Sequence, residues 1–343
     1  METVFPNVNR NSRVLEIASD GDARPLDSFV PEEVRRLSTE DEQRALPAIA
    51  KSRHLVDLVE RTAGEIPTSH KLVVGDARDL EVIPAASVHL VVTSPPYWTL
   101  KTYPTRDGQL GAIENYESFL AELDKVWAHV LRVLVPGGRL VVVVGDVCLS
   151  RRSFGRHLVF PLHSSIQEHC RNLGFDNLAP IIWYKIANAN HEVQRGSGFL
   201  GKPYEPNAII KNDIEFILFQ RKPGGYRRPS LAARLLSVIP EVSHREWFQQ
   251  IWTITGSSTR HHPAPFPVTL AERLVRMFSF VGDTVLDPFM GTGTTNLAAQ
   301  KWGRNSIGVE IEPAYLRMAE TRLRTKQIPF KFEAQKELRV HGA

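Results

Sequence analysis

A glycine turn between a strand and a helix, late in the chain, restricts the fold more than any other feature. Residues 281–286 (VGDTVL) predict a short strand, residues 289–293 (FMGTG) a tight turn, and residues 294–302 a helix that begins at once. A Gly-x-Gly turn lets the backbone approach a ligand closely and aims the helix N-terminus at that ligand. Such a turn is weak evidence alone, because many of them only join a strand to a helix.

Acidic residues stand where two predicted strands end. Residues 304–310 (RNSIGVE) predict a strand whose last residue, Glu310, is placed to accept hydrogen bonds from ribose hydroxyls. Glu312 is the second choice, and a solvated charge at a strand end is the alternative for both. Residues 72–80 (LVVGDARDL) predict another strand, followed by Asp76. Because FMGTG lacks the full G-x-G-x-x-G pattern, the turn argues against an NAD site.

A second unusual peptide, TSPPYW at residues 93–98, follows a largely apolar run at residues 88–92 (VHLVV). That run predicts a buried strand, so the peptide would lie at the carboxyl end of a parallel strand. Pro95 and Pro96 remove backbone donors and stiffen the turn. A proline-rich ligand for another protein, or an ordinary turn, is the alternative, and the strand directly before the peptide disfavours it.

In this order along the chain, TSPPYW and LDPFMGTGTT resemble the catalytic and cofactor peptides of the amino-methylating DNA methyltransferases, which methylate cytosine N4 or adenine N6. The order, with the catalytic peptide first, is that of the permuted β group of the family. Ser94 precedes Asp287 by 193 residues, which leaves room for most of a sheet and a DNA-reading insertion. HPAPFP at residues 262–267 and GVEIEPAY at residues 308–315 add to the resemblance.

The resemblance implies an α/β fold of the Rossmann-like class I methyltransferase type. This is a doubly wound, mostly parallel sheet with an antiparallel hairpin edge and an inserted DNA-recognition region. It also implies S-adenosylmethionine as the cofactor, direct methyl transfer to nitrogen, and neither a covalent enzyme intermediate nor a metal. Double-stranded DNA is the expected partner. A homodimer and a companion restriction endonuclease acting on the same site are further expectations.

Three residues have specific positions around the cofactor in the family pattern. Asp76 lies near the adenine ring, Asp287 lies near the methionine amino group, and Phe266 belongs to the HPAPFP peptide that closes over the methionine end. A turn cap is the alternative for Asp287, and a linker before a helix is the alternative for HPAPFP. The full predicted cofactor set is Asp76, Thr93, Phe266, Asp287, Phe289, Gly291, Gly293, Thr294 and Glu310.

The chemistry expected of TSPPYW follows from the delocalised lone pair of an exocyclic amino nitrogen. Two acceptors on its hydrogens would pull the nitrogen toward tetrahedral geometry and aim the lone pair at the methyl sulfonium. Ser94 Oγ and the Pro95 carbonyl can supply these acceptors, in a turn that Pro96 stiffens. Tyr97 would stack on a base flipped out of the duplex, and Trp98 would line this base pocket or pack behind it.

Ser94 favours cytosine N4, since in the family Ser at this position goes mainly with cytosine N4 and Asp mainly with adenine N6. Adenine N6 methylation, RNA methylation, and a non-catalytic DNA-binding or scaffold protein are the alternatives. The intact TSPPYW peptide and glycine turn disfavour the last of these. Cytosine C5 methylation needs a thiolate, typically a Cys after Pro, and neither Cys148 nor Cys170 follows Pro.

Alternating helical and strand patterns support a doubly wound sheet. Residues 119–134 carry apolar residues at helical spacing, and residues 139–145 (RLVVVVG) predict a central parallel strand. Residues 180–185 and 215–221 predict two strands that pair antiparallel. Further helices are predicted at residues 163–173 and 267–280.

The predicted organisation has five parts along the chain. They are a helical extension at residues 1–68, a catalytic half at 69–186, a target-recognition region at 187–262 that contains the core strand 214–221, a cofactor-binding half at 263–325, and a tail at 326–343. Residues 187–262 carry 10 Lys and Arg against 6 Asp and Glu, an excess equal to the net charge of +4 of the whole chain. Arg227, Arg228 and Arg260 are therefore the candidate DNA contacts, with a solvated surface charge as the alternative for each.

The remaining observations concern the N-terminal region and location. Residues 1–67 carry 9 Lys and Arg against 13 Asp and Glu, and they predict helices that would pack on the catalytic domain, mediate dimerisation or cover the DNA-entry side. The longest apolar run, residues 140–144, is too short to span a membrane, and the N-terminus has no apolar secretory segment. Two cysteines give neither a disulfide framework nor zinc-ligand spacing. The expected location is cytoplasmic.

Overall fold

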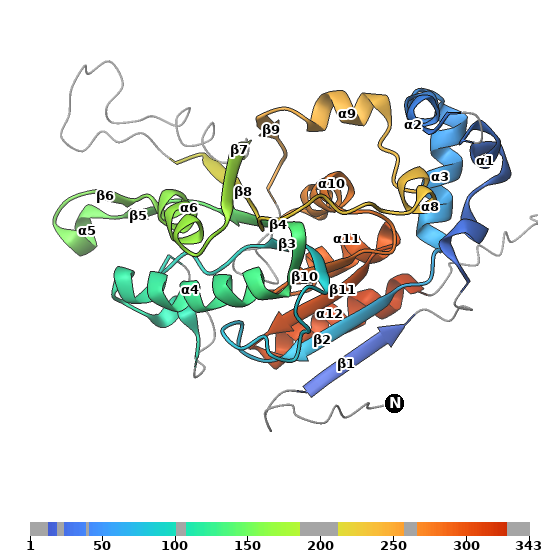
Figure 1. Cartoon of the computed structure of the whole chain (residues 1–343). Coiled ribbons are helices and arrows are strands. Elements are labelled where there is room, and N and C mark those ends of the chain that lie inside the picture. The colour runs from blue at the N-terminus through green and yellow to red at the C-terminus, as the bar shows by residue number, and fades with distance from the viewer. Residues whose placement is uncertain are drawn as a thin grey trace, which may run out of the picture.

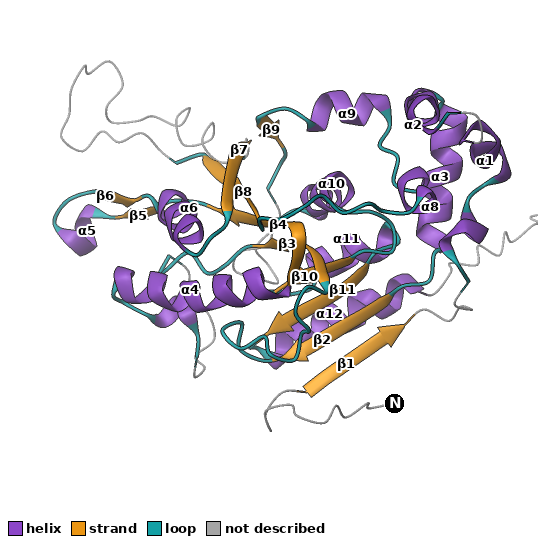
Figure 2. Cartoon of the chain, viewed as in Figure 1, coloured by secondary structure: helices purple, strands orange, loops and turns teal. Residues whose placement is uncertain are grey.

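One nine-stranded sheet runs through the described part of the chain (Figure 1 and Figure 2). The structure is a computed structural model that describes residues 13–18, 24–38, 41–100, 108–185, 212–256 and 266–327. In order across the sheet, the strands are β1 (Arg13–Ala18), β2 (Ser69–Val74), β11 (Asn305–Glu310), β10 (Thr284–Asp287), β3 (Val88–Thr93), β4 (Leu134–Val144), β8 (Ile214–Arg221), β7 (Asp176–Tyr184) and β9 (Ile251–Thr253).

The sheet is mostly parallel, and its strand order reverses at one point. β2, β11, β10, β3 and β4 run parallel, whereas β8 pairs antiparallel with both β4 and β7, which confirms the predicted hairpin. The chain passes from β10 to β11 on one side and from β3 to β4 on the other. In open α/β sheets, ligands bind at such a switch point, in the crevice outside the carboxyl ends of the strands. The fold therefore places a ligand site at the ends of β3 and β10.

Helices cover both faces of the sheet. α4 (Tyr116–Val133) and α6 (Leu162–Asn172) pack on one face, and α10 (Val268–Phe278) and α11 (Thr294–Lys301) pack on the other. α12 (Pro313–Gln327) contacts α11 and β2. Along β4, Val142 and Val144 face the α4 side and Val141 and Val143 face the α10 side. Burial on both faces explains why this strand is an unbroken apolar run.

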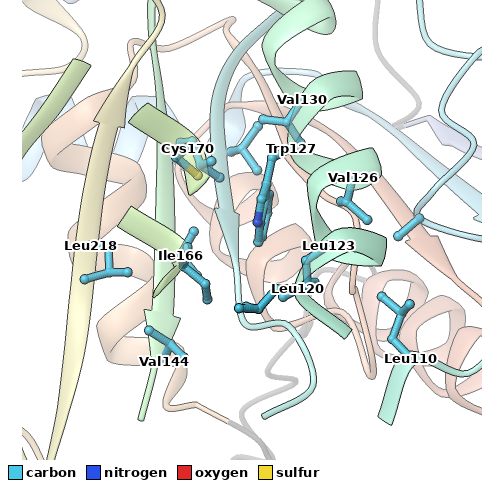
Figure 3. Close-up of a cluster of buried hydrophobic side chains, with 14 of the residues drawn as sticks. Leu110, Leu120, Leu123, Val126, Trp127, Val130, Val144, Ile166, Cys170 and Leu218 are labelled. Carbon is cyan, nitrogen blue, oxygen red and sulfur yellow. The ribbon is translucent and has the colours of Figure 1, made fainter. Parts of the chain in front are cut away.

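One of the two cysteines, Cys170, is buried in the core under α4. Trp127 and Leu123 of α4 pack with Ile166 and Cys170 of α6 over the sheet residue Val144 (Figure 3). Burial raises the pKa of the Cys170 thiol well above its usual range. Cys170 is therefore a packing residue.

The N-terminal region packs at the amino-terminal ends of the strands, on the edge of the sheet opposite the crevice. Its helices are α1 (Glu32–Ser38), α2 (Glu42–Lys51) and α3 (Arg53–Glu65). Val34 and Val59 share one apolar cluster with Leu235 and with Val281, which precedes β10. The sequence predicted a helical extension, but the region also contains a strand, because β1 extends the sheet by pairing antiparallel with β2. The described helices thus pack on the domain that the sheet forms.

The described part of the predicted target-recognition region is built into the domain. It contains α8 (Leu231–Leu235), α9 (Glu241–Trp247) and β9, which pairs parallel with β7. Trp247, Trp252 and Ile254 are buried in the core on the α10 side. The described part of the region, residues 212–256, therefore packs against the core, and residues 187–211 and 257–262 lie outside the described residues.

Short elements complete the described chain. They are η1 (Leu26–Phe29), η2 (Leu110–Ala112), β5 (Val147–Leu149), α5 (Arg151–Phe154) and β6 (Leu158–Phe160). None of the helices within the described residues has the length and apolar content that crossing a membrane requires.

Replacing Gly293 with Ala should destabilise the fold more than replacing Gly155 with Ala. Both glycines have positive φ, at 79° and 70°, so each substitution costs about 1–2 kcal/mol from the backbone. A Cβ at position 293 would also lie 2.8 Å from Ala319 Cβ, whereas a Cβ at position 155 would meet no atom within 4 Å. Urea unfolding of both variants measures the difference. Equal losses would contradict the close approach of the turn to α12.

Candidate active site

Two residues from opposite halves of the chain meet at the switch point. Thr93, at the end of β3, donates from Oγ1 to Oδ1 of Asp287, at the end of β10, at 2.7 Å. Thr295 Oγ1 lies 2.9 Å from Asp287 Oδ2 and 3.1 Å from the Val92 carbonyl oxygen. The Phe289 N–H also donates to Asp287 Oδ1, at 3.1 Å. Burial raises the pKa of Asp287 to about 6.

These contacts give Asp287 a structural role. The residue is 2% exposed, and both of its carboxylate oxygens are engaged by the strand ends and the glycine turn. It is also absent from the lining of the pocket described below. Its placement favours the turn-cap alternative for Asp287, and contact with the methionine amino group stays a prediction.

The glycine turn folds back onto the end of β11. Gly291 and Gly293 have φ values of 54° and 79°, in the region that favours glycine. The Gly291 N–H donates to Glu310 Oε2 at 2.8 Å. Thr294, the first residue of α11, is buried behind the turn. The turn therefore fixes the Glu310 carboxylate.

Glu310 and Glu312, the two candidates for the ribose contact, have different surroundings. Glu310 lines the pocket, and its Oε1 accepts the Glu312 N–H at 2.9 Å. Burial, as the largest cause, raises the pKa of Glu310 to about 7. Glu312 Oε1 instead accepts the Ala314 N–H at 2.9 Å, which caps the start of α12. This geometry favours Glu310 for a ligand contact.

An open pocket lies at the carboxyl ends of β2, β3, β10 and β11. It has about 600 Å³ of space, part of it open solvent. It brings together five predicted site residues, namely Asp76, Ser94, Pro96, Phe289 and Glu310. The rest of the wall is largely apolar and includes Leu110, Pro288, Val309 and Ile311. Four other predicted cofactor residues do not line this pocket, namely Thr93, Gly291, Gly293 and Thr294.

Asp76 is held by an arginine that we did not single out in the sequence. The Arg78 backbone N–H and side-chain Nε donate to Asp76 Oδ1 at 2.9 and 3.0 Å, and Arg78 Nη2 donates to Oδ2 at 2.6 Å. Arg78 also pairs with Glu122 of α4, and hydrogen bonds to Asp76 and Glu122 raise the pKa of the guanidinium. The only local signal was the spacing Asp-x-Arg after the strand.

The catalytic peptide carries a chain of hydroxyl contacts. Ser94 Oγ lies 3.3 Å from Tyr97 Oη. Tyr97 Oη lies 3.2 Å from both the Val143 carbonyl oxygen and Glu215 Oε2. The Tyr97 ring lies close to the backbone of Gly145, where a Cβ would be 3.4 Å from Tyr97 Cε2. Glu215 is therefore another residue of the site that the sequence did not reveal.

Trp98 packs behind the pocket and does not line it. Its indole N–H donates to the Ile113 carbonyl at 2.8 Å, and its ring contacts Tyr116 and Phe160 at centroid distances of 5.2 and 5.0 Å. Trp98 has a φ of 48°, an uncommon conformation for a bulky residue. Of the two expected placements, packing behind the pocket is the one observed.

The remaining predicted residues lie away from the pocket. Phe266 packs against the core on the α10 side, and residues 262–265 of the same peptide lie outside the described residues. Arg227 pairs with Asp283 at the start of β10, with Nη1 2.6 Å from Oδ1, at the edge opposite the crevice. Exposed Arg228 follows it on that edge, and Arg260 is not among the described residues. This placement, on the edge opposite the pocket, disfavours the expected DNA contact of Arg227 and Arg228, which stays untested.

The strand order and the pocket at the switch point define a class I methyltransferase fold. The putative DNA modification methylase TTHA0409 of Thermus thermophilus, solved with S-adenosyl-L-methionine, superimposes with a TM-score of 0.62 at 56% identity, covering 76% of this chain and 94% of that chain. PvuII DNA methyltransferase (cytosine-N4-specific) gives a TM-score of 0.53 at 20% identity, covering 75% of this chain and 91% of that chain. This second likeness shows the fold alone.

The sequence comparisons define the family. A DNA methylase family model of the N6/N4 type matches residues 88–321. Type II methyltransferase M.MjaI of Methanocaldococcus jannaschii is 38% identical over 291 residues, which are 77% of this chain and 94% of that protein. Type II methyltransferase M.MthZI of Methanothermobacter thermautotrophicus is 33% identical over 279 residues, which are 75% and 77% of the two chains. The chain therefore belongs to the N6/N4 DNA methylase family, and its cofactor is S-adenosylmethionine.

Replacing Glu310 with Gln should change how stability depends on pH in the absence of cofactor. The folded-state pKa of about 7 lies above the ordinary value of 4.5, so between these values the folded chain binds more protons than the unfolded chain. Relative to Glu310→Gln, the wild-type free energy of unfolding should fall by on the order of 3 kcal/mol as pH rises through this window. Urea titrations across the window measure this, and a difference that stays flat with pH would contradict the assignment.

Proposed function

We propose that this chain transfers a methyl group from S-adenosylmethionine to the exocyclic N4 of cytosine in duplex DNA. The observation that carries the proposal is that Ser94 and Glu310 line the same pocket. An acceptor for the amino group and an acceptor for ribose hydroxyls therefore share one cavity. Pro96 from the TSPPYW peptide and Phe289 from the glycine turn also line this pocket.

The pocket fits a nucleoside that carries hydroxyl groups. Each Glu310 oxygen accepts one backbone N–H and keeps lone pairs for the ribose hydroxyls. Asp76, oriented by Arg78, would accept from the adenine amino group, and the apolar side chains of Phe289 and Ile311 offer contact to its ring. When bound, S-adenosylmethionine supplies an electrophilic methyl group.

The catalytic peptide would prepare the amino nitrogen for transfer. Ser94 Oγ and the Pro95 carbonyl would accept its two hydrogens and localise its lone pair toward the methyl carbon. The proton that the nitrogen loses after the transfer would pass to solvent water, because a hydroxyl and an amide carbonyl are too weakly basic to keep it. The ring of Tyr97 would stack on the base. A target inside a duplex must be flipped out to reach this pocket, at a cost of about a few kcal/mol.

Adenine N6 is the second candidate, because the matching family model spans both chemistries. The choice of cytosine rests on Ser94 and the family tendency. The test combines purified protein, labelled S-adenosylmethionine and unmethylated genomic DNA, with mass spectrometry of the product nucleosides. We expect N4-methylcytosine. N6-methyladenine would overturn the assigned base, and label in competing RNA but not in DNA would overturn the assigned substrate.

Replacing Ser94 with Ala should lower kcat by about 10²–10³-fold, the usual effect of removing one preorganised hydrogen-bonding group from a reacting centre. The dissociation constant for S-adenosylmethionine should not change, because Glu310 and Asp76 remain. Single-turnover methylation and calorimetry measure the two quantities. A Ser94→Ala variant that transfers methyl at the wild-type rate would remove this account of the pocket.

The biological setting is also a proposal. Both archaeal relatives are Type II methyltransferases, which supports a role in a restriction-modification system with a companion endonuclease for the same site. Target readout would fall to the region of residues 187–262, of which residues 187–211 and 257–262, including Arg260, lie outside the described residues. A homodimer, expected from the resemblance, is open to measurement by light scattering.

A further inference from the structure

An ion pair on the β7–β8 hairpin reaches the catalytic peptide. Glu215, near the start of β8, pairs through Oε1 with Lys185, which follows β7. The other carboxylate oxygen lies 3.2 Å from Tyr97 Oη. Glu215 is largely buried, with 14% of its side chain exposed. A buried carboxylate placed on a tyrosine hydroxyl in this way can control the direction in which that hydroxyl donates.

The chemistry of the partners fixes the direction of the hydroxyl protons. Two neighbours of Tyr97 Oη, the Glu215 carboxylate and the Val143 carbonyl, are acceptors only. The single Tyr97 proton therefore goes to one of these two. In its contact with Ser94, Tyr97 Oη is then the acceptor, so the Ser94 proton points toward Tyr97.

We infer that Glu215 and the Tyr97 hydroxyl orient Ser94 so that Oγ offers lone pairs, and not its proton, to the amino group of the base. Glu215 is a positioning residue in this arrangement, because it acts through Tyr97. The two hydrogens of the amino group require two acceptors. A Ser94 hydroxyl whose proton faced the amino group would place one hydrogen-bond donor against another. The inference rests on the proposed role of Ser94.

Tyr97→Phe tests the hydroxyl chain, since it keeps the aromatic ring and removes only the hydroxyl that accepts from Ser94 and donates to Glu215 or Val143. We expect kcat to fall about tenfold, equal to about 1.4 kcal/mol in the barrier. The KM for DNA and the dissociation constant for S-adenosylmethionine should stay at their wild-type values. Glu215→Ala should lower kcat less, because the Val143 carbonyl remains, and it should have no effect in the Tyr97→Phe background.

A double-mutant cycle separates this role from a structural one. Adding Tyr97→Phe to Ser94→Ala should cause no further loss, since the two groups act as one unit. The matched control is Asp176→Asn, which breaks the Asp176–Arg221 ion pair at the far end of the same hairpin and should leave kcat unchanged. A wild-type kcat in Tyr97→Phe, or additive losses of kcat in the double variant, would overturn this inference but leave the proposed function standing. Full activity of Ser94→Ala would overturn the proposed function as well.

A second and independent feature is a basic hairpin beside the catalytic peptide. Residues 147–160 comprise β5, α5 and β6, and they contain three arginines and a histidine but no acidic residue. Arg151, Phe154 and Arg156 are exposed, and Phe154 shows 51% of its surface. Figure 1 shows this hairpin projecting beyond α4 and α6. An exposed aromatic ring between cations is a surface that suits a polyanion with apolar edges.

The hairpin is fixed to the pocket side of the sheet. β5 follows the carboxyl end of β4 after two residues, and β6 ends at Phe160, whose ring contacts Trp98 and Tyr116 at 5.0 and 4.8 Å. Trp98 is the last residue of TSPPYW. A duplex bound to the hairpin would therefore be held at a set position relative to the catalytic peptide.

We propose that this hairpin binds the duplex DNA substrate beside the target base, with Arg156 on a phosphate and Phe154 against the groove or sugar edge. The proposal rests on DNA being the substrate, whichever base is methylated. Charge complementarity supports it, because the hairpin carries only positive charge and follows the carboxyl end of β4.

Salt-dependent binding of an oligonucleotide duplex tests the hairpin. Arg156→Ala should weaken binding and reduce the slope of log Kd against log salt by about one, as expected for one lost phosphate contact. Phe154→Ala should weaken binding without changing this slope. The control is Arg228→Ala, an exposed arginine at the opposite edge of the sheet, which should change neither quantity. Wild-type binding by both hairpin variants, or an equal loss in Arg228→Ala, would overturn the proposal. Wild-type protein that binds no duplex would overturn the proposed function as well.

Discussion

The hydrogen bond from Thr93 to Asp287 joins the two halves of the site, and the rest of the pocket depends on it. A buried carboxylate without partners would cost several kcal/mol, so the hydroxyls of Thr93 and Thr295 hold the ends of β3 and β10 against each other. β3 leads into the catalytic peptide and β10 leads into the glycine turn. A single carboxyl group thus sets the position of the proposed amino-group acceptors relative to the cofactor turn.

Each wall of the pocket comes from a different strand end. Asp76 follows β2, Ser94 follows β3, Phe289 follows β10 and Glu310 ends β11, and these four strands are neighbours in the sheet. Glu215 adds a contact from β8 through Tyr97. The permuted order of the chain does not affect this arrangement, because the sheet brings the strand ends to one edge whatever their sequence order.

The sequence predicted the parts of the fold whose signals are local. Continuous apolar runs identify the central strands, and Gly291 and Gly293 identify a turn that needs positive φ. The sequence could not predict contacts between residues that lie far apart in the chain. The excess of positive charge at residues 187–262 pointed to Arg227, but its partner Asp283 lies 56 residues away at the edge opposite the pocket. The sequence also could not show that Asp287 points into the core, because side-chain direction at a strand end depends on the neighbouring strand.

A crystal structure with S-adenosylhomocysteine and a duplex that carries the target site tests the central claim most directly. The account predicts ribose hydroxyls on the Glu310 carboxylate, an extruded cytosine with its amino group on Ser94 Oγ and the Pro95 carbonyl, and an intact Thr93–Asp287 hydrogen bond. A ligand bound away from Glu310, or a target base that enters without contacting Ser94, would contradict it.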